Sequence, residues 1–455
     1  MTSLQGIVRM AQLDRAVLAG LGHRLWQGAA GLLTLLLVGR FLSPELQGGY
    51  FAFYSVAAFQ TLSDLGLYLV VANVASHEWS RLRFDQNGRL AGDGTARSRL
   101  LHFAGALGRW YGALAVGSGL AVGGAGLWFF ERTLPPEVSW RLPWLALVAA
   151  SSLLLWSQPC LALLEGCGQI ATLNRYRLAF AVAGSGLLWY GLASGLELWS
   201  VPLGAAPLVA RDAALLGWRY RHLTRDALRP GPGPSIDWRA EVWPMQWRLG
   251  VQGISQYAAV QLFTPIVLYY HGAAAAGRMG MTWAAVSGIQ TAALVWLQVR
   301  VPEFGVLVAR RDRRELDRLW RNATTLAISA VAGGGTLLCL LIAWLSFTDR
   351  AGAARLLPPA AAALLVAGAC GAQYVQGVAA YVRAHKRELL LPVGVTASVA
   401  SGGLAWILGQ VWGGEGVSAA YAVVMVGIAS PIAGRILRRF RGGQPADLRE
   451  ARSHP

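Results

Sequence analysis

The chain has 455 residues, of which 55% are apolar and only 14% are charged. Its mean hydropathy is +0.43. So few charges cannot cover the water-facing surface of a soluble protein of this length, whereas helix faces that contact lipid need none. The composition excludes an ordinary soluble multidomain protein and predicts an all-α, polytopic membrane protein.

The charge balance is strongly basic. Lys and Arg total 40 and Asp and Glu total 23, which gives a net charge of +17. Such an excess can indicate nucleic acid, a membrane surface or an acidic substrate. Most of these bases fall in short polar segments between apolar runs, as in the cytoplasmic loops of membrane proteins, so we expect membrane lipid and no nucleic acid as a partner. The cysteines lack metal-ligand spacing, and we expect no metal and no cofactor.

The first two apolar runs predict one hairpin of membrane-spanning helices. The run 21–38 is followed by a corner at 39–50 and by a second run that ends at Ala75. Both runs approach or exceed the roughly 20 residues with which a helix crosses a bilayer. Arg24 and Asp64 interrupt them. A charge at such depth costs at least about 2.5–3.5 kcal/mol and usually faces a bundle interior or a water-filled cavity.

This hairpin resembles a known family. The first run ends in Gly-Arg-Phe-Leu-Ser-Pro-Glu-Leu-Gln-Gly-Gly-Tyr, and the second contains Leu-Ser-Asp-Leu-Gly-Leu. With the basic amphipathic start, these residues are similar to the first hairpin of the Wzx-type polysaccharide (O-antigen) flippases. That family is part of the multidrug/oligosaccharidyl-lipid/polysaccharide (MOP) exporter superfamily. The close match covers about Gly20 to Asn73, and beyond it only the helix count and the loop pattern agree.

Ten further apolar runs bring the predicted total to twelve spans. The repeated Pro and Gly of 229–234 cannot hold a helix, so we expect a linker there. The predicted organisation is a six-helix half at 1–218, a cytoplasmic linker at 219–248, a second six-helix half at 249–437 and a basic cytoplasmic tail at 438–455. The ten runs are 111–130, 143–166, 180–196, 202–217, 249–270, 279–299, 324–347, 359–382, 391–411 and 417–437.

The two predicted halves repeat weakly. A shift of 230 residues places Gly49-Tyr50 on Met279-Gly280 and Gln60-Thr61 on Gln290-Thr291 without a gap. Because each half has an even number of spans, both enter the membrane from the same side. This predicts parallel repeats with a substrate path between them near the midplane. Since the bases cluster in alternate loops, we expect both termini in the cytoplasm.

Polar side chains inside the predicted spans are the candidate site residues. Arg24 is expected either to bind an anionic group or to extend its guanidinium to the interface. Asp64 is expected to pair with Arg24 or to bind a proton or cation. Arg211 and Asp212 are adjacent, so we do not expect them to face each other. Amides can bind sugar hydroxyls and can equally hold helices together. The candidate substrate-binding residues are Arg24, Arg248, Arg211, Gln256, Gln290 and Gln373, and the candidate ion-coupling residues are Asp64 and Asp212.

Enzyme motifs are missing from the sequence. It contains no nucleotide-binding phosphate loop, no H-E-x-x-H and no G-x-S-x-G elbow, and the predicted outer loops are short. By resemblance, a polysaccharide polymerase or ligase would carry a sizeable outer loop, so we expect a transporter rather than an enzyme.

The resemblance implies a flippase of the bacterial cytoplasmic (inner) membrane. Such a protein moves undecaprenyl-diphosphate-linked oligosaccharides, which are O-antigen or exopolysaccharide repeat units, from the inner to the outer leaflet by alternating access. The resemblance further implies phosphate binding by Arg24 with help from Arg248, ion coupling by Asp64, and a polysaccharide polymerase or ligase as a protein partner.

Two other functions on the same fold stay open. An ion-coupled multidrug exporter should have an acidic cavity for cationic drugs, whereas the interior charges here lean basic. A peptidoglycan-precursor flippase would by resemblance usually have helices beyond twelve.

Overall fold

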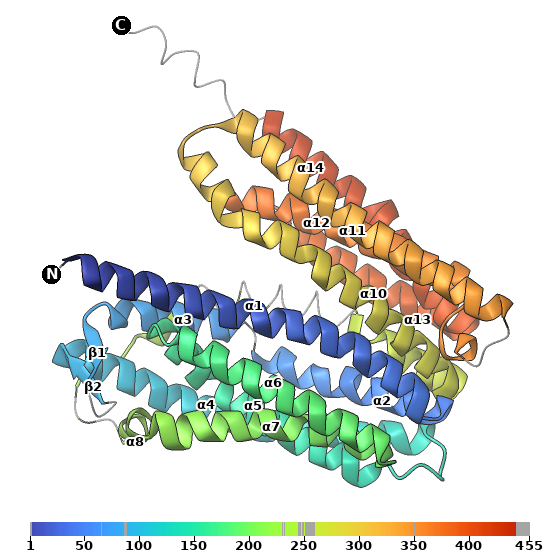
Figure 1. The fold of residues 1–455 in the computed structure, drawn as a ribbon, viewed down its shortest axis with the longest axis horizontal. Coiled ribbons are helices and arrows are strands. Elements are labelled where there is room, and N and C mark those ends of the chain that lie inside the picture. Colours follow the sequence, from blue (N-terminus) through green and yellow to red (C-terminus); the bar gives the residue numbers. More distant parts are fainter. Residues whose placement is uncertain are drawn as a thin grey trace, which may run out of the picture. The chain divides into compact units, whose positions relative to one another are not determined.

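The computed structural model describes residues 2–64, 66–85, 89–229, 231, 233–243, 247, 250, 260–348 and 352–442. Across these residues the chain is helical almost throughout, and the sheet there is one two-stranded hairpin (Figure 1). Six helices of this part of the chain are long and apolar enough to cross a membrane. The all-α, multi-pass membrane fold predicted from the composition is confirmed.

Two compact units divide the chain. Met1–Gly277 forms the N-lobe, and Arg278–Pro455 forms the C-lobe. The boundary falls inside the helix α10 (Phe263–Ala309), so this helix begins in the N-lobe and ends in the C-lobe. The placement of the linker at 219–248 stays a prediction, and in that segment short helices flank the Pro-Gly repeat.

Long antiparallel helices make up the N-lobe, where α1 packs chiefly along α6 and α4 along α5. The Ser43 hydroxyl accepts a hydrogen bond from the N–H of Leu46 at 3.2 Å, and the Asp93 carboxylate accepts one from Ala96 at 2.7 Å. Both are N-caps that define where a helix begins. The elements are α1 (Thr2–Phe41), α2 (Pro44–Ala57), the 3-10 helix η1 (Ala58–Asp64), α3 (Leu67–Trp79), β1 (Leu82–Phe84), β2 (Leu90–Gly92), α4 (Gly94–Thr133), α5 (Arg141–Gly166), α6 (Ile170–Ala193), η2 (Glu197–Trp199), α7 (Ser200–Ala214), the π-helix η3 (Leu215–Arg219), α8 (Arg221–Leu228) and the π-helix η4 (Trp238–Val242).

A close helix crossing joins α2 to the first part of α10 within the N-lobe. A Cβ at Gly48 would lie 2.0 Å from the carbonyl oxygen of Ala273, so only glycine fits there. Gln47 is 1% exposed and donates from Nε2 to the carbonyl oxygen of Gly277 at 2.8 Å. Small residues let membrane helices approach closely in this way. The start of α10 is therefore fixed to the second span.

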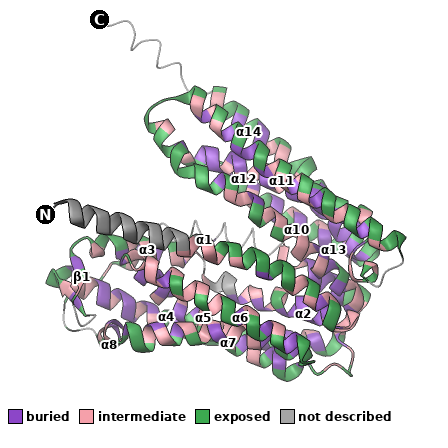
Figure 2. Ribbon diagram, viewed as in Figure 1, coloured by how far each residue is buried: buried purple, intermediate pink, exposed green. Residues whose placement is uncertain are grey.

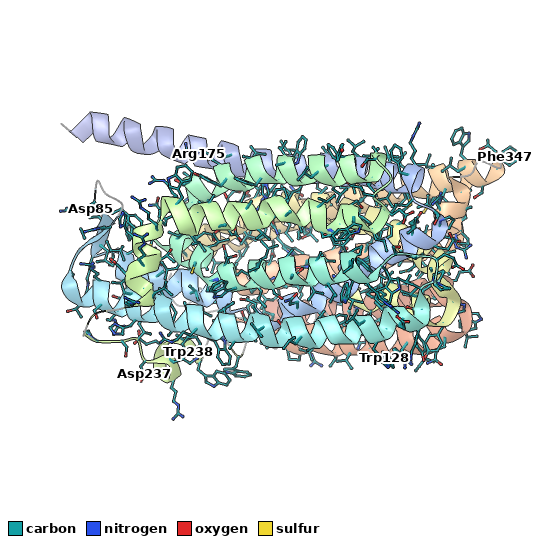
Figure 3. All side chains as sticks on the ribbon, turned by 90° about the horizontal axis from the view of Figure 1, so that it is seen from below. Asp85, Trp128, Arg175, Asp237, Trp238 and Phe347 are labelled. Carbon is teal, nitrogen blue, oxygen red and sulfur yellow. The ribbon has the colours of Figure 1, made fainter. Side chains whose placement is uncertain are left out.

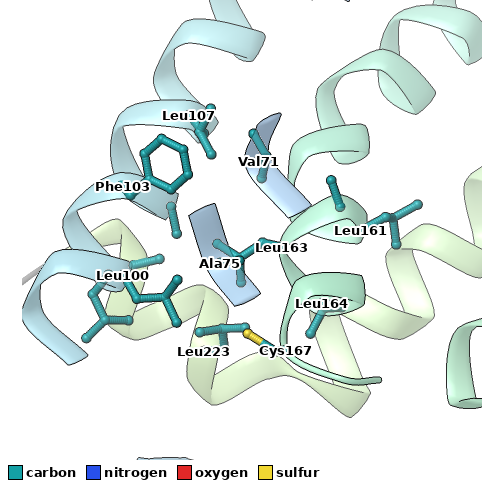
Figure 4. Close-up of a cluster of buried hydrophobic side chains, with 14 of the residues drawn as sticks. Val71, Ala75, Leu100, Phe103, Leu107, Leu161, Leu163, Leu164, Cys167 and Leu223 are labelled. Atoms are coloured by element: carbon teal, nitrogen blue, oxygen red, sulfur yellow. The ribbon is translucent and has the colours of Figure 1, made fainter. Parts of the chain in front are cut away.

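The main apolar core of the N-lobe lies where α3 meets α4 and α5. Figure 4 shows part of it, with Val71 and Ala75 of α3 between side chains of α4 and α5. The short helix α8 adds Leu223 to the same cluster. Figure 3 places Asp85, Arg175 and Asp237 toward the end of the lobe that carries the β-hairpin, and Trp128 toward the other end.

The C-lobe is built from the rest of α10 and the helices that follow it. Two glycines with positive φ interrupt long helices, Gly272 (φ 81) in the N-lobe part of α10 and Gly413 (φ 57) in α13 of the C-lobe. Each lies where one predicted span ends and the next begins. The elements after α10 are α11 (Arg313–Phe347), η5 (Ala353–Arg355), α12 (Pro359–Ala384), α13 (Leu391–Ala422), the π-helix η6 (Val423–Ala429) and α14 (Ser430–Gly442).

Many large apolar side chains are exposed along these helices (Figure 2). Leu120 of α4 is 73% exposed, and Leu337 of α11 is 69% exposed. A soluble protein rarely exposes such broad apolar surface, whereas lipid covers it. The exposure pattern thus agrees with the hydropathy of the sequence.

Candidate functional site

The second membrane span is broken at Asp64. The 3-10 helix η1 ends at this residue, Gly66 has a left-handed backbone with φ 71, and α3 begins at Leu67. The left-handed conformation costs a residue other than glycine about 1–2 kcal/mol, which explains the glycine. A broken helix inside a membrane leaves backbone groups that protein or a water-filled cavity must satisfy. The break is therefore where this span can contact polar groups.

Three groups hold the Asp64 carboxylate at this break, and one of them is the backbone N–H of Gly66. The hydroxyl of Tyr111, which α4 supplies and which is fully buried, donates to Oδ1. The backbone N–H of Tyr68 donates to Oδ2 at 3.5 Å. Asp64 therefore lies at the N-terminus of α3, where unpaired N–H groups favour a negative charge. The expected pairing of Asp64 with Arg24 stays a prediction.

Arg177 connects three helices and contacts the side chain of Tyr68. Its Nη2 donates to the hydroxyl of Tyr68 on α3 at 2.9 Å. Its Nη1 lies 2.6 Å from Oε1 of Glu165 on α5. Both side chains are less than a quarter exposed, at 24% and 21%. Arg177 itself comes from α6. Partly buried charge-assisted bonds of this kind are stronger than neutral ones and fix the three helices together.

Helix α1 adds two basic residues to this region. His23 is half-buried, and the charges of Arg177, Arg211 and Arg24 all act on its ring. Guanidinium groups from α1, α6 and α7 are thus within electrostatic range of one histidine. Arg24 is exposed on α1. Two of these guanidinium groups pair with carboxylates, Arg177 with Glu165 and Arg211 with a residue of its own helix, so their charges are largely balanced.

Arg211 and Asp212 pair with each other. Nε of Arg211 donates to Oδ1 of Asp212 at 2.7 Å, and the hydroxyl of Ser157 on α5 donates to Oδ2 at 2.6 Å. Asp212 is only 4% exposed. The prediction that these neighbours do not face each other is wrong, because the long arginine side chain folds back along α7 to reach the shorter one beside it.

The remaining candidate residues lie elsewhere. Gln290 of α10 forms a hydrogen bond with the side chain of Tyr421 in the C-lobe. Gln373 of α12 is 1% exposed, and neither polar atom of its amide has a partner among the residues that the structure describes. Arg248 and Gln256 lie outside the described residues.

The structure thus assembles one group of side chains that the sequence indicated only in part, and we call it the N-lobe polar network. The sequence places Arg177 in a loop before the apolar run 180–196, whereas α6 begins at Ile170 and includes it. Gly66, two residues after Asp64, is the signal in the sequence for the helix break. The network consists of His23, Arg24, Asp64, Tyr68, Tyr111, Ser157, Glu165, Arg177, Arg211 and Asp212.

Neither a family model nor a curated protein matches the sequence. Solved structures do match it. An inward-facing multidrug resistance MATE family transporter of the MOP superfamily aligns with a TM-score of 0.70 and 13% identity, over 94% of this chain and 99% of its own. The Lipid II flippase MurJ in an inward closed conformation aligns with a TM-score of 0.61 and 11% identity, over 93% of this chain and 87% of its own.

A third match is a MOP superfamily transporter from Pyrococcus furiosus with a binding pocket of reverse polarity. It has a TM-score of 0.55 and 14% identity, over 94% of this chain and 96% of its own. Identities this low show the fold alone. The chain therefore has the twelve-helix fold of MOP-superfamily transporters, as the resemblance of its first hairpin led us to expect.

Proposed function

We propose that this protein is a flippase for lipid-linked oligosaccharides. It moves O-antigen or exopolysaccharide repeat units on undecaprenyl diphosphate from the cytoplasmic to the outer leaflet of the bacterial inner membrane, by alternating access. The transporter fold supports the general activity, and the resemblance of the first hairpin supplies the substrate class. The observation that carries the proposal is the exposed Arg24 on α1, with open space over Gly28 and Gly31 on the same helix face.

Each acidic side chain of the N-lobe polar network already has a partner within the protein. Glu165 pairs with Arg177, and Asp212 pairs with Arg211. Asp64 accepts hydrogen bonds from side-chain and backbone donors. A ligand that approaches along α1 therefore meets an exposed arginine before it meets a carboxylate. Arginine binds phosphate oxygens through a planar fork of donors, which suits a diphosphate.

The face of α1 beside Arg24 leaves room for such a ligand. Gly28 and Gly31 lie four and seven residues after Arg24, so the three share one helix face. A Cβ at either glycine would meet nothing within 4 Å. On the adjacent face, Leu32 and Leu36 are 63% and 70% exposed. A polyprenyl tail can lie against these leucines in lipid while its diphosphate reaches Arg24.

We assign ion coupling to Asp64 within the same proposal, because a carboxylate at a break in a membrane helix is the kind of group that binds a proton or cation. The same feature favours a second candidate function, an ion-coupled exporter of cationic drugs. The two functions differ in what approaches the network, which is a phosphate in the first and a cation in the second.

Transport in proteoliposomes tests the proposal. A fluorescent undecaprenyl-diphosphate oligosaccharide is reconstituted with the native chain, with Arg24→Gln, or with Arg40→Gln as a matched control from the exposed outer part of the same helix. Loss of one charged hydrogen bond, worth about 1.5–3 kcal/mol, should slow flipping by Arg24→Gln roughly tenfold to a hundredfold. The control should flip at the native rate.

Two further arms separate the alternatives. Proton-driven efflux of a cationic dye that requires Asp64, without any flipping of the glycolipid, would replace the flippase by the drug exporter. Faster flipping of Lipid II than of the oligosaccharide would instead identify the peptidoglycan precursor as the substrate.

A further inference from the structure

Three helices of the C-lobe are joined at one end by an arginine between aromatic rings. The guanidinium of Arg441 on α14 lies 4.8 Å from the ring centroids of both Trp320 on α11 and Tyr381 on α12. Its Nη2 pairs with Asp317 at 2.9 Å. The α10 to α11 turn and the end of α14 lie at this same end of the lobe (Figure 1). The three elements therefore present one continuous surface.

This surface is dense in exposed bases that have no acidic partner. None of eleven such residues takes part in an ion pair within the part of the chain that the structure describes. We call them the C-lobe basic surface. They are Arg310, Arg311, Arg313, Arg314, Arg321, Arg383, Lys386, Arg387, Arg435, Arg438 and Arg439.

Basic loops of the N-lobe are arranged differently. Arg97 pairs with Asp226 at 3.2 Å, and Arg99 pairs with both Glu78 and Glu241 at 2.8 and 2.7 Å. Exposed arginines outside these ion pairs occur in the N-lobe as well, among them Arg81, Arg83 and Arg89. What distinguishes the C-lobe bases is that they gather at one end of helices that Arg441 joins.

Two of these bases occupy strained positions. Arg311 and Lys386 have φ 57 and φ 58 in the turns that follow α10 and α12. Glycine usually occupies such a position, and Gly168 does so after α5 with φ 71. A side chain there costs about 1–2 kcal/mol. The C-lobe tolerates this strain at two turns, and in both it gains a cation on the same surface.

The position of the surface indicates its partner. It lies where α11 begins and α12 ends, outside the apolar runs 324–347 and 359–382 that predict membrane spans. On α14, Ala433, Leu437 and Phe440 are buried, while Arg435 and Arg438 are exposed on the opposite face. We propose that the C-lobe basic surface binds the headgroups of anionic phospholipids in the leaflet at this end. Clusters of bases beside membrane helices attract such lipids electrostatically.

Lipid binding by the full-length protein in detergent tests this proposal. The probes are short-chain phosphatidylglycerol and short-chain phosphatidylcholine, titrated against native protein and the triple variant Arg435→Gln/Arg438→Gln/Arg439→Gln. The matched control is Arg81→Gln/Arg83→Gln/Arg89→Gln, which removes three exposed bases of the N-lobe. We expect the C-lobe triple to bind phosphatidylglycerol about tenfold more weakly or worse, and the control to bind as the native protein does.

Salt and charge provide further tests. Binding should weaken as salt rises, because exposed charges are screened. Replacing the same three arginines by lysine should keep the binding and shows that the glutamine variant fails through charge and not through folding. Equal loss in the two glutamine triples, equal binding of both lipids, or tighter binding of a single-stranded oligonucleotide than of phosphatidylglycerol would each overturn the proposal.

Discussion

The two lobes treat charge inside the membrane in opposite ways. The N-lobe places three arginines and three carboxylates in one connected network across α1, η1, α5, α6 and α7. In the C-lobe, the sequence of 279–299, 322–347, 359–382, 391–414 and 416–434 contains no Asp, Glu, Lys or Arg. The predicted repeat between the halves therefore does not extend to these charges. Charged side chains within the predicted spans belong to the N-lobe, whereas these C-lobe segments carry only neutral polar groups.

The largest expected effect comes from breaking the buried pair of the N-lobe. Asp212→Ala leaves the largely buried guanidinium of Arg211 without this carboxylate partner. It also removes the oxygen that accepts the hydrogen bond of the Ser157 hydroxyl. Removing one partner of a buried ion pair typically costs about 3–5 kcal/mol. Thermal and denaturant unfolding in detergent measures the loss. The control is Glu131→Ala, which breaks an exposed pair with Arg141 and should cost at most about 1 kcal/mol. Similar losses of unfolding free energy in the two variants would show that the buried pair stabilises the protein no more than an exposed pair does.

Removing the hydroxyl beside the helix break should have the next largest effect. Tyr111→Phe keeps the ring but deprives Asp64 of its side-chain donor. A hydrogen bond to a charged group contributes about 1.5–3 kcal/mol, so the free energy of unfolding of the variant should fall by that amount. Tyr190→Phe, at a residue that is 64% exposed on α6, is the control. An unchanged stability of Tyr111→Phe would mean that Asp64 is held by other groups.

Replacing a neutral amide in the C-lobe should change the free energy of unfolding in the opposite direction. Gln373 is buried without a partner among the described residues, and a buried group of this kind costs about 1–3 kcal/mol. Gln373→Met should therefore leave the protein equally stable or more stable. The control Gln60→Met lies in the N-lobe, where Nε2 donates to Ser152 at 2.6 Å, and should lose about 1 kcal/mol. Loss of stability in Gln373→Met would indicate that the amide binds water or another partner in the C-lobe.

The smallest expected effect concerns a single strained turn. Lys386→Gly relieves the left-handed backbone at φ 58 and should raise the unfolding free energy by about 1 kcal/mol. Gly168→Lys places the same charge in the comparable turn of the N-lobe, where φ is 71, and should lower it by a similar amount. A destabilised Lys386→Gly would show that the lysine side chain makes contacts that outweigh the strain.

The membrane fold was predictable because only long apolar helices satisfy their backbone groups in lipid, and such helices appear in the sequence as long apolar runs. Helix ends were less predictable. The helix α4 begins at Gly94 and α11 at Arg313, well before their apolar runs, because polar turns continue a helix outside the bilayer without any change in periodicity.

The site was predictable in its residue types and not in its contacts. Arg24, Asp64, Arg211 and Asp212 were identified because charges are costly in a membrane. Nothing in the sequence marks their partners, because polar residues of these types also occur in apolar helices without such contacts. Only the packing of α4 and α5 against the other helices reveals Tyr111, Glu165 and Ser157. The pairing of Arg211 with Asp212 depended on one flexible side chain, which helix geometry alone does not determine.

The crossing of α2 with α10 has a consequence for the order of synthesis. The amide of Gln47 is buried against the carbonyl of Gly277, although 230 residues separate them in the chain. A ribosome that has completed the sixth predicted span has not yet made this acceptor. The α2 to α10 crossing can therefore form only after the corner that follows the seventh predicted span, with the last residues of the N-lobe, has been made.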